Sequence, residues 1–328
     1  MDVFASAFKS PRPAVALIGA GAMGRALGLR LAESGYPIHA VLSRRPGPAE
    51  ALATLLGASF GSDRLGDIPE VPLVVLAVPD DQIADLAETL ADAPRSWQGA
   101  VVLHTSGAAP AALLEPLRQR GARTLAFHPL QAVTREADAH TLDGVTVGVE
   151  GEPEGVAAGI ELAVGLGMRY LKVSADAKPR YHLAAAMASN LMVTLMGMVQ
   201  EVLASIGIDR ADGMAALEPL LHGTLDNLAT SSPEDALTGP VARGDLSTLR
   251  AHGLALRRHL PHLVPAYAAL SVETVRLAVR AGKLPPDQAE EVLTLMERMV
   301  TLPLPQPPTA PDGTRPPAPT RGSGVGAA

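Results

Sequence analysis

The chain has 328 residues, of which 47% are hydrophobic, and its formal net charge is −7 at pH 7. This length and composition predict a large hydrophobic core divided between two domains. The negative charge gives no electrostatic reason to expect nucleic acid or an anionic membrane surface as a partner. The absence of cysteine excludes disulfides, thiolate metal sites and cysteine nucleophiles.

The N-terminal residues Met1–Pro13 lack the long apolar segment of a signal peptide. No uninterrupted apolar run in the chain reaches the roughly 18 residues that a membrane helix needs. We therefore expect a cytoplasmic protein that does not bind membranes, and we predict no metal site.

A glycine-rich turn follows the first predicted strand, Val15–Ile18, and a helix is predicted from Met23 to Ser34. This is the arrangement of a dinucleotide-binding turn. Its first glycine permits the tight turn, its second lets the backbone approach the pyrophosphate, and its third lets the helix pack on the strand. The pyrophosphate then lies at the positive end of the helix dipole. We expect cofactor contacts from Gly19, Ala20, Gly21, Ala22, Met23 and Gly24.

The second predicted strand, Pro37–Leu42, indicates which dinucleotide is bound. It ends in Ser43, Arg44 and Arg45, whereas NAD-binding domains usually place an acidic residue there to accept from the ribose 2′-hydroxyl. A hydroxyl and two guanidiniums bind a 2′-phosphate through charge-assisted hydrogen bonds. The sequence therefore predicts NADP(H) as cofactor. The alternative is that the two arginines only make a loop soluble.

Strand-like and helical segments alternate as far as Val173. The other predicted strands are Leu73–Val78, Ala100–His104, Thr124–Phe127, Val145–Val149 and Met168–Lys172, and the other predicted helices are Asp81–Leu90, Ala109–Gln119 and Gly155–Gly165. This alternation predicts a Rossmann-type, doubly wound α/β sheet, mostly parallel, with helices on both faces.

Ligands of such sheets bind beyond the carboxyl ends of the strands. Val78 and Pro79 stand at one predicted strand end, Ser106 follows a second, and His128 follows a third. Pro129 keeps His128 out of helical geometry. We predict cofactor contacts from Val78 and Pro79 and a catalytic, substrate-orienting role for Ser106 and His128. Each of these clusters alone is also compatible with an ordinary turn.

After Ser174 the pattern is helical only, with segments Ala177–Ile206, Ala211–Ala229, Leu246–Leu256, Pro261–Ala281 and Pro285–Val300. We therefore divide the chain into an N-terminal extension, a dinucleotide-binding domain, an all-helical domain and a tail, at residues 1–13, 14–173, 174–301 and 302–328. The tail is rich in Pro, Gly, Ala and Thr without apolar periodicity, which predicts disorder.

The long helix opens with several polar residues. At the spacing of an α-helix, Lys178, His182 and Ser189 lie on one stripe, with Tyr181 to one side of it and Asn190 near its edge. Alanines between them let a nicotinamide or a substrate approach closely. We predict catalytic roles for Lys178, His182 and Asn190, and substrate contacts from Tyr181 and Ser189. The alternative is a lysine at a helix start and a hydrogen-bonded core histidine.

A Gly-Pro turn interrupts the helical region after Thr238 and is followed by Arg243 and Asp245. The guanidinium of Arg243 is suited to clamp a substrate carboxylate, with Thr238 as a further substrate contact. Asp245 is equally suited to cap the next helix. The sequence leaves both interpretations open.

These motifs together resemble a family that joins a Rossmann domain to a helical C-terminal domain of unknown function. The wider likeness is to the superfamily of ketopantoate reductase, pyrroline-5-carboxylate reductase, 6-phosphogluconate dehydrogenase and β-hydroxyacid dehydrogenases, and deazaflavin-dependent NADP reductases share the N-terminal half. In the hydroxyacid branch a lysine on the first helix of the second domain is the acid/base, with an asparagine further along. Lys178 and Asn190 occupy similar places, although Ser174–Ala177 replaces that branch's glycine-rich stretch.

The resemblance implies an NADPH-dependent reductase of a small carbonyl metabolite of the 2-oxo acid type, with ketopantoate as the first substrate to test. Either Lys178 or His182 supplies the proton in this interpretation. The alternatives are a cyclic-imine reductase of the pyrroline-5-carboxylate type and a non-catalytic NADP(H)-binding sensor. Because the helix Ala177–Ile206 is too apolar to bury in one small domain, we also expect a homodimer.

Overall fold

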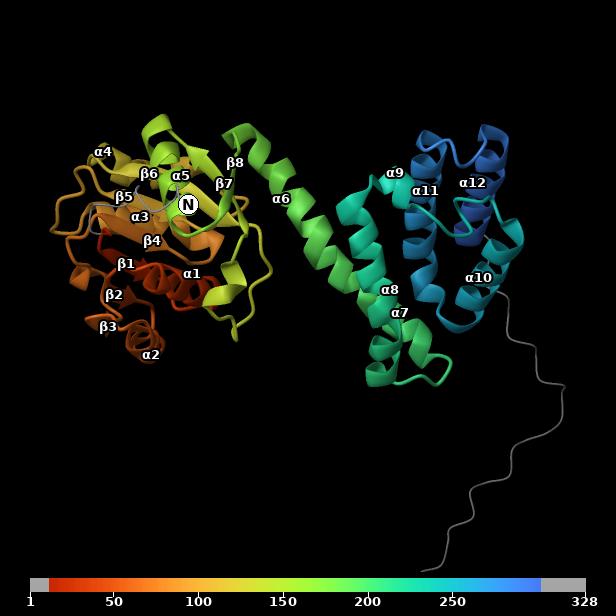
Figure 1. Cartoon of the computed structure of the whole chain (residues 1–328), viewed down its shortest axis with the longest axis horizontal. Helices are drawn as coiled ribbons and strands as arrows, with labels where there is room; N and C mark the ends of the chain where they lie inside the picture. Colours follow the sequence, from red (N-terminus) through yellow and green to blue (C-terminus); the bar gives the residue numbers. More distant parts are fainter. Residues whose placement is uncertain (1–11, 302–328) are drawn as a thin grey trace, which may run out of the picture. The chain divides into compact units, whose positions relative to one another are not determined.

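The computed structural model describes residues 12–301, which form two compact units with a boundary between Val193 and Thr194 (Figure 1). We describe each unit by itself. The sequence placed the boundary at Ser174, where the α/β alternation ends, but the first unit continues through the polar start of the long helix. The predicted tail and all but two residues of the predicted N-terminal extension lie outside the described residues.

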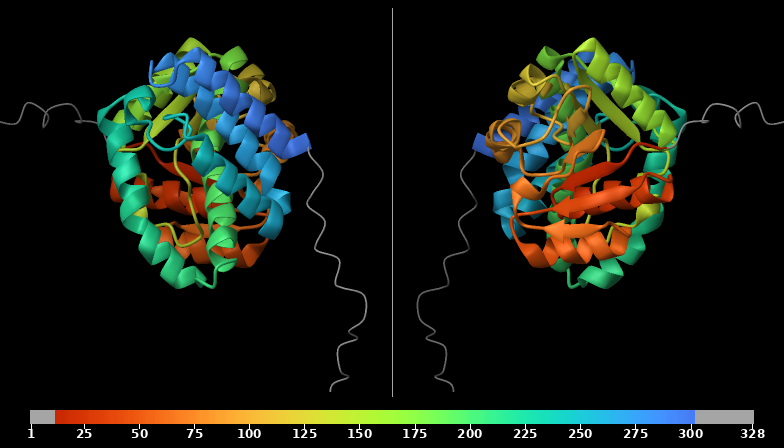
Figure 2. Two further views of the ribbon diagram at one scale, coloured as in Figure 1. Left: turned by 90° about the vertical axis from the view of Figure 1, so that its right-hand side faces the viewer. Right: turned by 90° about the vertical axis from the view of Figure 1, so that its left-hand side faces the viewer.

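The first unit is built on one eight-stranded sheet in the order β3-β2-β1-β4-β5-β6-β7-β8. All neighbouring strands are parallel except β6 and β7, which are antiparallel. The right-hand view of Figure 2 shows the red and orange strands of the N-terminal half side by side. The strands are β1 (Val15–Ile18), β2 (Ile38–Leu42), β3 (Phe60–Ser62), β4 (Leu73–Leu76), β5 (Val101–His104), β6 (Arg123–Pro129), β7 (Thr146–Gly151) and β8 (Arg169–Lys172).

Helices cover both faces of this sheet. They are α1 (Ala22–Glu33), α2 (Pro46–Leu56), α3 (Ile83–Ala91), α4 (Glu115–Gln119) and α5 (Pro153–Gly165). The helix α6 (Lys178–Ala186) follows β8 and begins the long helical segment. Single 3₁₀ turns lie at Leu65–Asp67 (η1), Asp80–Gln82 (η2), Ala111–Leu114 (η3), Ala139–Leu142 (η4) and Ala175–Ala177 (η5), and a π-helical turn follows α6 at Met187–Leu191 (η6).

The strand β1 explains why the sheet is covered on both sides. Val15 and Leu17 belong to the core cluster under α1, α2 and α5, while Ala16 and Ile18 belong to the cluster under α3 and α4. All four are at most 3% exposed. Such continuous apolar runs are typical of parallel strands buried on both faces, and each large aliphatic side chain buried this way contributes about 1.5–3 kcal/mol. The predicted doubly wound sheet is confirmed.

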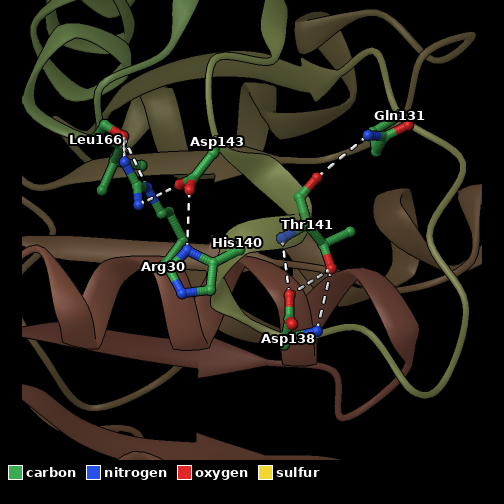
Figure 3. A network of polar contacts seen from close by, with 7 residues as sticks. All are labelled: Arg30, Gln131, Asp138, His140, Thr141, Asp143 and Leu166. Atoms are coloured by element: carbon green, nitrogen blue, oxygen red, sulfur yellow. Dashed lines mark hydrogen bonds and ion pairs between the residues drawn. The ribbon is translucent and has the colours of Figure 1, made fainter.

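The connection between β6 and β7 folds back onto α1 (Figure 3). From α1, Arg30 pairs with Asp143 of this connection at 2.5 Å. The same guanidinium also donates to the carbonyl of Leu166, at the end of α5, at 2.6 and 2.8 Å. The connection is stiffened by a capping box between Asp138 and Thr141, and His140 contacts Asp143 at 2.9 Å. The connection thereby fixes the helix that follows the glycine-rich turn.

The second unit is helical throughout its described part. It contains most of α7 (Met192–Ala204), then α8 (Arg210–Thr230), α9 (Pro233–Ala236), α10 (Leu246–His259), a 3₁₀ turn at Pro261–Leu263 (η7), α11 (Val264–Arg280) and α12 (Pro286–Thr301). Its core lies between α10, α11 and α12 and includes Leu249, Val275 and Met296. The predicted all-helical second domain is confirmed.

The helices α7 and α8 contribute almost nothing to that core. No residue of α7 is buried, and Gly213 is the one buried residue of α8. The continuous segment Ala175–Ala204 is also long and apolar enough to cross a membrane by length and composition, the single such helix among residues 12–301. The apolar side chains of α7 and α8 are therefore largely exposed.

Candidate active site at the carboxyl edge of the sheet

The three glycines of the first turn have the roles that a dinucleotide site requires. Gly19 has a φ of +115°, and a Cβ there would overlap with the carbonyl oxygen of Ala77. A Cβ at Gly24 would overlap with the carbonyl oxygen of Gly19, whereas one at Gly21 would meet no atom within 4 Å. The turn is therefore closed on the protein side and open at Gly21, where a close approach of a ligand to the backbone is needed.

The start of α1 is suited to bind a phosphate. Gly21 is the N-cap and offers no side chain to the free N–H groups, and the first turn contains no acidic residue. Unpaired N–H groups at the positive end of a helix dipole attract anions. Ala20, Ala22 and Met23 are partly exposed beside them. The predicted turn thus fits the pyrophosphate of a dinucleotide.

The residues after β2 have no internal partner that would hold their charges. Arg44 and Arg45 are exposed, and within residues 12–301 neither guanidinium takes part in an ion pair. The hydroxyl of Ser43 donates to the carbonyl of Arg45 at 2.7 Å, which closes the turn. Two unneutralised guanidiniums at this position are available to an anionic group.

The neighbouring strand ends contribute to the same edge of the sheet. Because β1, β4, β5 and β6 are adjacent and parallel, their carboxyl ends lie side by side. Val78 and Pro79 follow β4, Ser106 follows β5, and His128 lies near the end of β6. The sheet order reverses between β1 and β4, which is where doubly wound sheets bind ligands.

The turn after β5, residues 104–111, is tied by its own side chains. His104 accepts the N–H of Ser106 at its Nδ1 (3.2 Å), and its Nε2 contacts the carbonyl of Pro110 at 3.3 Å. The Ser106 hydroxyl accepts from the N–H groups of Ala108 and Ala109 at 3.2 and 2.9 Å. Burial, and then the nearby charge of Lys178, lowers the pKa of His104 to about 4. His104 is therefore neutral, as its acceptor role at Nδ1 requires.

Two imidazoles and a phenol gather around this turn. The Tyr181 hydroxyl lies 3.0 Å from Nδ1 of His128, and the rings of His128 and His182 are 6.2 Å apart. A methyl group on Gly107 would lie 2.7 Å from atoms of both imidazoles. A Cβ on Gly148 would overlap with the phenol of Tyr181. Glycine at these two positions makes room for the aromatic side chains.

The electrostatics of this cluster favour neutral side chains at His128 and Tyr181. Burial, followed by the charge of Lys178, lowers the pKa of His128 to about 4. Burial raises the pKa of Tyr181 to about 12, against a backbone hydrogen bond with Gly148. At neutral pH, Tyr181 is protonated and His128 is uncharged. His182, by contrast, has an exposed side chain.

Lys178 lies beneath these groups and is only 2% exposed. Its Nζ donates to the carbonyl of Ser106 at 3.3 Å and lies 3.9 Å from Oε2 of Glu150 on β7. Burial lowers the pKa of Lys178, while Glu150 and Asp80 oppose that shift. The predicted stripe thus separates into an enclosed lysine and an exposed histidine.

Ser189 and Asn190 lie within the π-helical turn, which the sequence did not predict. Each residue of this wider turn advances by a smaller angle than in an α-helix, so Asn190 comes closer to the face of His182 than in a regular helix. Single π turns within helices are frequent at functional sites.

The two predicted substrate contacts of the second domain lie in the second unit. Thr238 and Arg243 are exposed, and Lys283 holds their loop by donating to the carbonyls of Asp235 and Leu237 at 2.8 Å each. Asp245 is the N-cap of α10 and accepts from the N–H of Thr248 at 3.1 Å. The capping interpretation of Asp245 is therefore confirmed. The role of Arg243 stays a prediction.

The sequence assigned no role to four residues of this site: His104, Gly107, Gly148 and Glu150. The signal for Glu150 was a carboxylate directly after the apolar strand segment 145–149, and the signal for Gly107 was its place shortly after a predicted strand end. Within residues 12–301, no three His, Asp or Glu side chains lie close enough together to hold a metal ion.

Comparisons with known proteins agree with this architecture. A Rossmann-like domain model matches residues 2–129, and the model of a domain of unknown function, DUF2520, matches residues 145–274. No curated protein sequence matches the chain.

Several solved structures share the fold. One is a protein from Bacteroides fragilis described as a candidate NADP oxidoreductase, with 22% identity, a TM-score of 0.68, and coverage of 80% of this chain and 98% of that one. A protein from Thermotoga maritima has 24% identity, a TM-score of 0.67 and coverage of 80% and 99%. A reductive aminase from Aspergillus terreus, in complex with NADPH and ethyl levulinate, has 20% identity, a TM-score of 0.57 and coverage of 87% and 99%. The chain therefore joins a Rossmann-like domain to a DUF2520 domain, as its resemblance to that two-domain family implied.

Proposed function

We propose that this protein is an NADPH-dependent reductase of a small carbonyl metabolite of the 2-oxo acid type. The observation that carries the proposal is the shared sheet edge. The open glycine turn, Ser106 and His128 lie at the carboxyl ends of the parallel strands β1, β5 and β6, and His182 of α6 lies against the turn at Gly107. The similarity to the structure from Bacteroides fragilis, described as a candidate NADP oxidoreductase, supports it. So does the similarity to the reductive aminase that holds NADPH.

The residues present fit NADP(H). Gly19, Gly21 and Gly24 shape the pyrophosphate turn, Ser43, Arg44 and Arg45 bind the 2′-phosphate, and Val78 and Pro79 contact the cofactor along β4. When bound, the reduced nicotinamide supplies a hydride to the substrate carbonyl carbon. The side chains of the protein bind and orient the substrate and supply the proton.

The carbonyl oxygen needs a proton as the hydride arrives, and we propose His182 as its donor. His182 is exposed beside Gly107, whereas Lys178 is enclosed with Glu150. His128, held by Tyr181, orients the substrate together with Ser106 and Asn190. Ser189, Thr238 and Arg243 are proposed as further substrate contacts, with Arg243 directed to a carboxylate.

The test is NADPH oxidation by the full chain on a panel of 2-oxo acids, with ketopantoate first, and of cyclic imines such as pyrroline-5-carboxylate. We expect turnover on at least one 2-oxo acid, followed as loss of absorbance of the reduced nicotinamide. Turnover on imines alone would favour the cyclic-imine reductase, which the similarity to the reductive aminase supports as a second candidate. Tight NADPH binding without turnover on any compound would favour a sensor.

We also propose that the protein is a cytoplasmic homodimer in which a second copy covers the apolar faces of α7 and α8. Val193 of α7 is 71% exposed and Leu220 of α8 is 65% exposed, and extensive exposed apolar surface marks an interaction surface. We expect sedimentation of the purified protein at the mass of a dimer. Val193→Asp should shift it to a monomer, whereas Leu254→Asp, at a similarly exposed position on α10, should leave the dimer intact. A wild-type monomer that binds neutral lipid vesicles would contradict the dimer and point to a membrane.

A further inference from the structure

Glu150 is a buried carboxylate for which the sequence predicts no role. It lies on β7, opposite Ala126 of β6, and its side chain is 7% exposed. Its Oε2 accepts the N–H of Ala111 at 2.7 Å and lies 3.9 Å from Nζ of Lys178. A charge enclosed this far is stable only when it is paired and hydrogen-bonded. Glu150 meets both conditions through two other segments of the chain.

Those contacts reach both ends of one turn. Glu150 holds the N–H of Ala111, where η3 begins, and Lys178 holds the carbonyl of Ser106, near the start of the turn after β5. His104 links the same turn internally through Ser106 and Pro110. The carboxylate and the ammonium therefore clamp residues 104–111 from the side of the sheet and from the first turn of α6.

The clamped turn carries Gly107 between the two imidazoles. Because an added methyl group would lie 2.7 Å from atoms of both His128 and His182, the backbone there has no free space on that side. A small shift of the turn would therefore move one ring or the other. The position of the turn thus sets the distance between the imidazoles.

We propose that Glu150 and Lys178 form a positioning pair that fixes residues 104–111 and, through Gly107, the spacing of His128 and His182. This inference rests on the proposed function only in giving the imidazoles a catalytic purpose. The pair has a second effect, because the charge of Lys178 acts on the imidazoles of His104 and His128. It opposes protonation of His104, whose Nδ1 must accept from Ser106, and of His128, which faces Tyr181.

The charged and titratable groups around His128 are Lys178, His182, Asp80, Tyr181 and His104. Those around Lys178 are Glu150 and Asp80, together with the imidazoles of His104 and His128. The charge of Lys178 lowers the pKa of His128, whereas Asp80 raises that pKa. Removing the ammonium group of Lys178 should therefore raise the pKa of His128. Burial is the larger cause and remains, so the pKa of His128 should stay below the ordinary 6.5.

The experiment compares Glu150→Gln, Lys178→Met and the double variant in the full chain. Glutamine at 150 still accepts the N–H of Ala111, and methionine fills the volume of the lysine stem without its charge. The pKa of His128 is measured by NMR titration, with His128→Gln used to assign its signal. We expect the pKa of His128 to rise in Lys178→Met, because the variant removes the charge that lowers it. A matched control pair is Glu273→Gln and Arg276→Met on the exposed face of α11, which should change nothing.

Turnover gives the second measurement. A positioning pair predicts a roughly tenfold loss of kcat in each single variant and unchanged NADPH affinity. It also predicts a double variant no worse than either single one, because each single variant already removes the ion pair between Glu150 and Lys178. An unmoved His128 pKa in Lys178→Met would overturn the proposal. So would full activity in Glu150→Gln together with complete loss in Lys178→Met, since that pattern identifies Lys178 as the proton donor. If wild type reduces none of the tested substrates, the proposed function fails, but the NMR titration still tests the pair.

Discussion

Replacing His182 with alanine is expected to lower turnover by about 10²–10⁴-fold while sparing NADPH affinity, because a positioned general acid contributes in that range and acts only in the transition state. His182 is exposed at the sheet edge, beside Gly107 and 6.2 Å from the ring of His128. The measurement is kcat, normalised to folded protein, together with NADPH affinity by fluorescence titration. A matched control is His39→Ala, an exposed histidine on β2, which should keep full turnover.

Lys178→Ala separates this prediction from its main alternative. If Lys178 donates the proton, its loss costs the larger factor. Turnover in His182→Ala then still falls at alkaline pH, because a proton donor is inactive once it is deprotonated. If both side chains are structural, each variant loses thermal stability and keeps its turnover per folded molecule. Full activity in both variants would remove α6 from the mechanism and leave Ser106 and His128 as the candidates.

Most of the sheet could be predicted from the sequence because its strands are continuous apolar runs buried on both faces. The strand β1 is Val-Ala-Leu-Ile, at most 3% exposed along its whole length. Among the strands and α-helices of the first unit, two were not predicted. The strand β3 is the three-residue edge segment Phe-Gly-Ser, without an apolar run, and α2 opens with Pro-Gly-Pro, which resembles a loop although proline is well tolerated in a first helical turn.

The glycine turn was predictable from the sequence, since its three glycines lie within six residues and only the approach to Ala77 involves a distant segment. Gly19, Gly21 and Gly24 are close in sequence, and their geometric roles depend only on β1, α1 and the end of β4. The interior of the site was not predictable from the sequence. The enclosure of Lys178 depends on Glu150 of β7 and on Ser106, which lies far earlier in the chain. Helical periodicity gives the stripe on which a side chain lies, but it does not show which distant strand that stripe meets.

The π-helical turn at Met187–Leu191 illustrates the same limit. Its residues are ordinary helix formers with no glycine or proline, so composition predicts an unbroken α-helix. One wider turn changes which side chains share a face. For that reason Asn190, predicted near the edge of the stripe, lies closer to the histidine face than α-helical spacing indicates.

Arg44→Ala is expected to weaken NADPH binding roughly ten- to a hundredfold and to leave NADH binding nearly unchanged. Losing one charged hydrogen bond to a 2′-phosphate costs about 1.5–3 kcal/mol, which corresponds to that loss of affinity. The structure supplies the reason for selectivity: Arg44 and Arg45 are exposed after β2 without an ion pair among residues 12–301, so their charges remain available. Affinities for both cofactors are measured by fluorescence titration at one fixed salt concentration.

The ratio of the two affinities decides the interpretation, because a damaged fold would weaken both cofactors together. Arg120→Ala removes the same charge from a surface site after α4, where the guanidinium contacts Asp92 at 3.4 Å, and should leave both affinities unchanged. Higher salt should weaken NADPH more in wild type than in Arg44→Ala, since screening acts on the contact that the variant lacks. Equal losses for NADPH and NADH in Arg44→Ala would mean that the guanidinium supports the β2–α2 turn and does not read the 2′-phosphate.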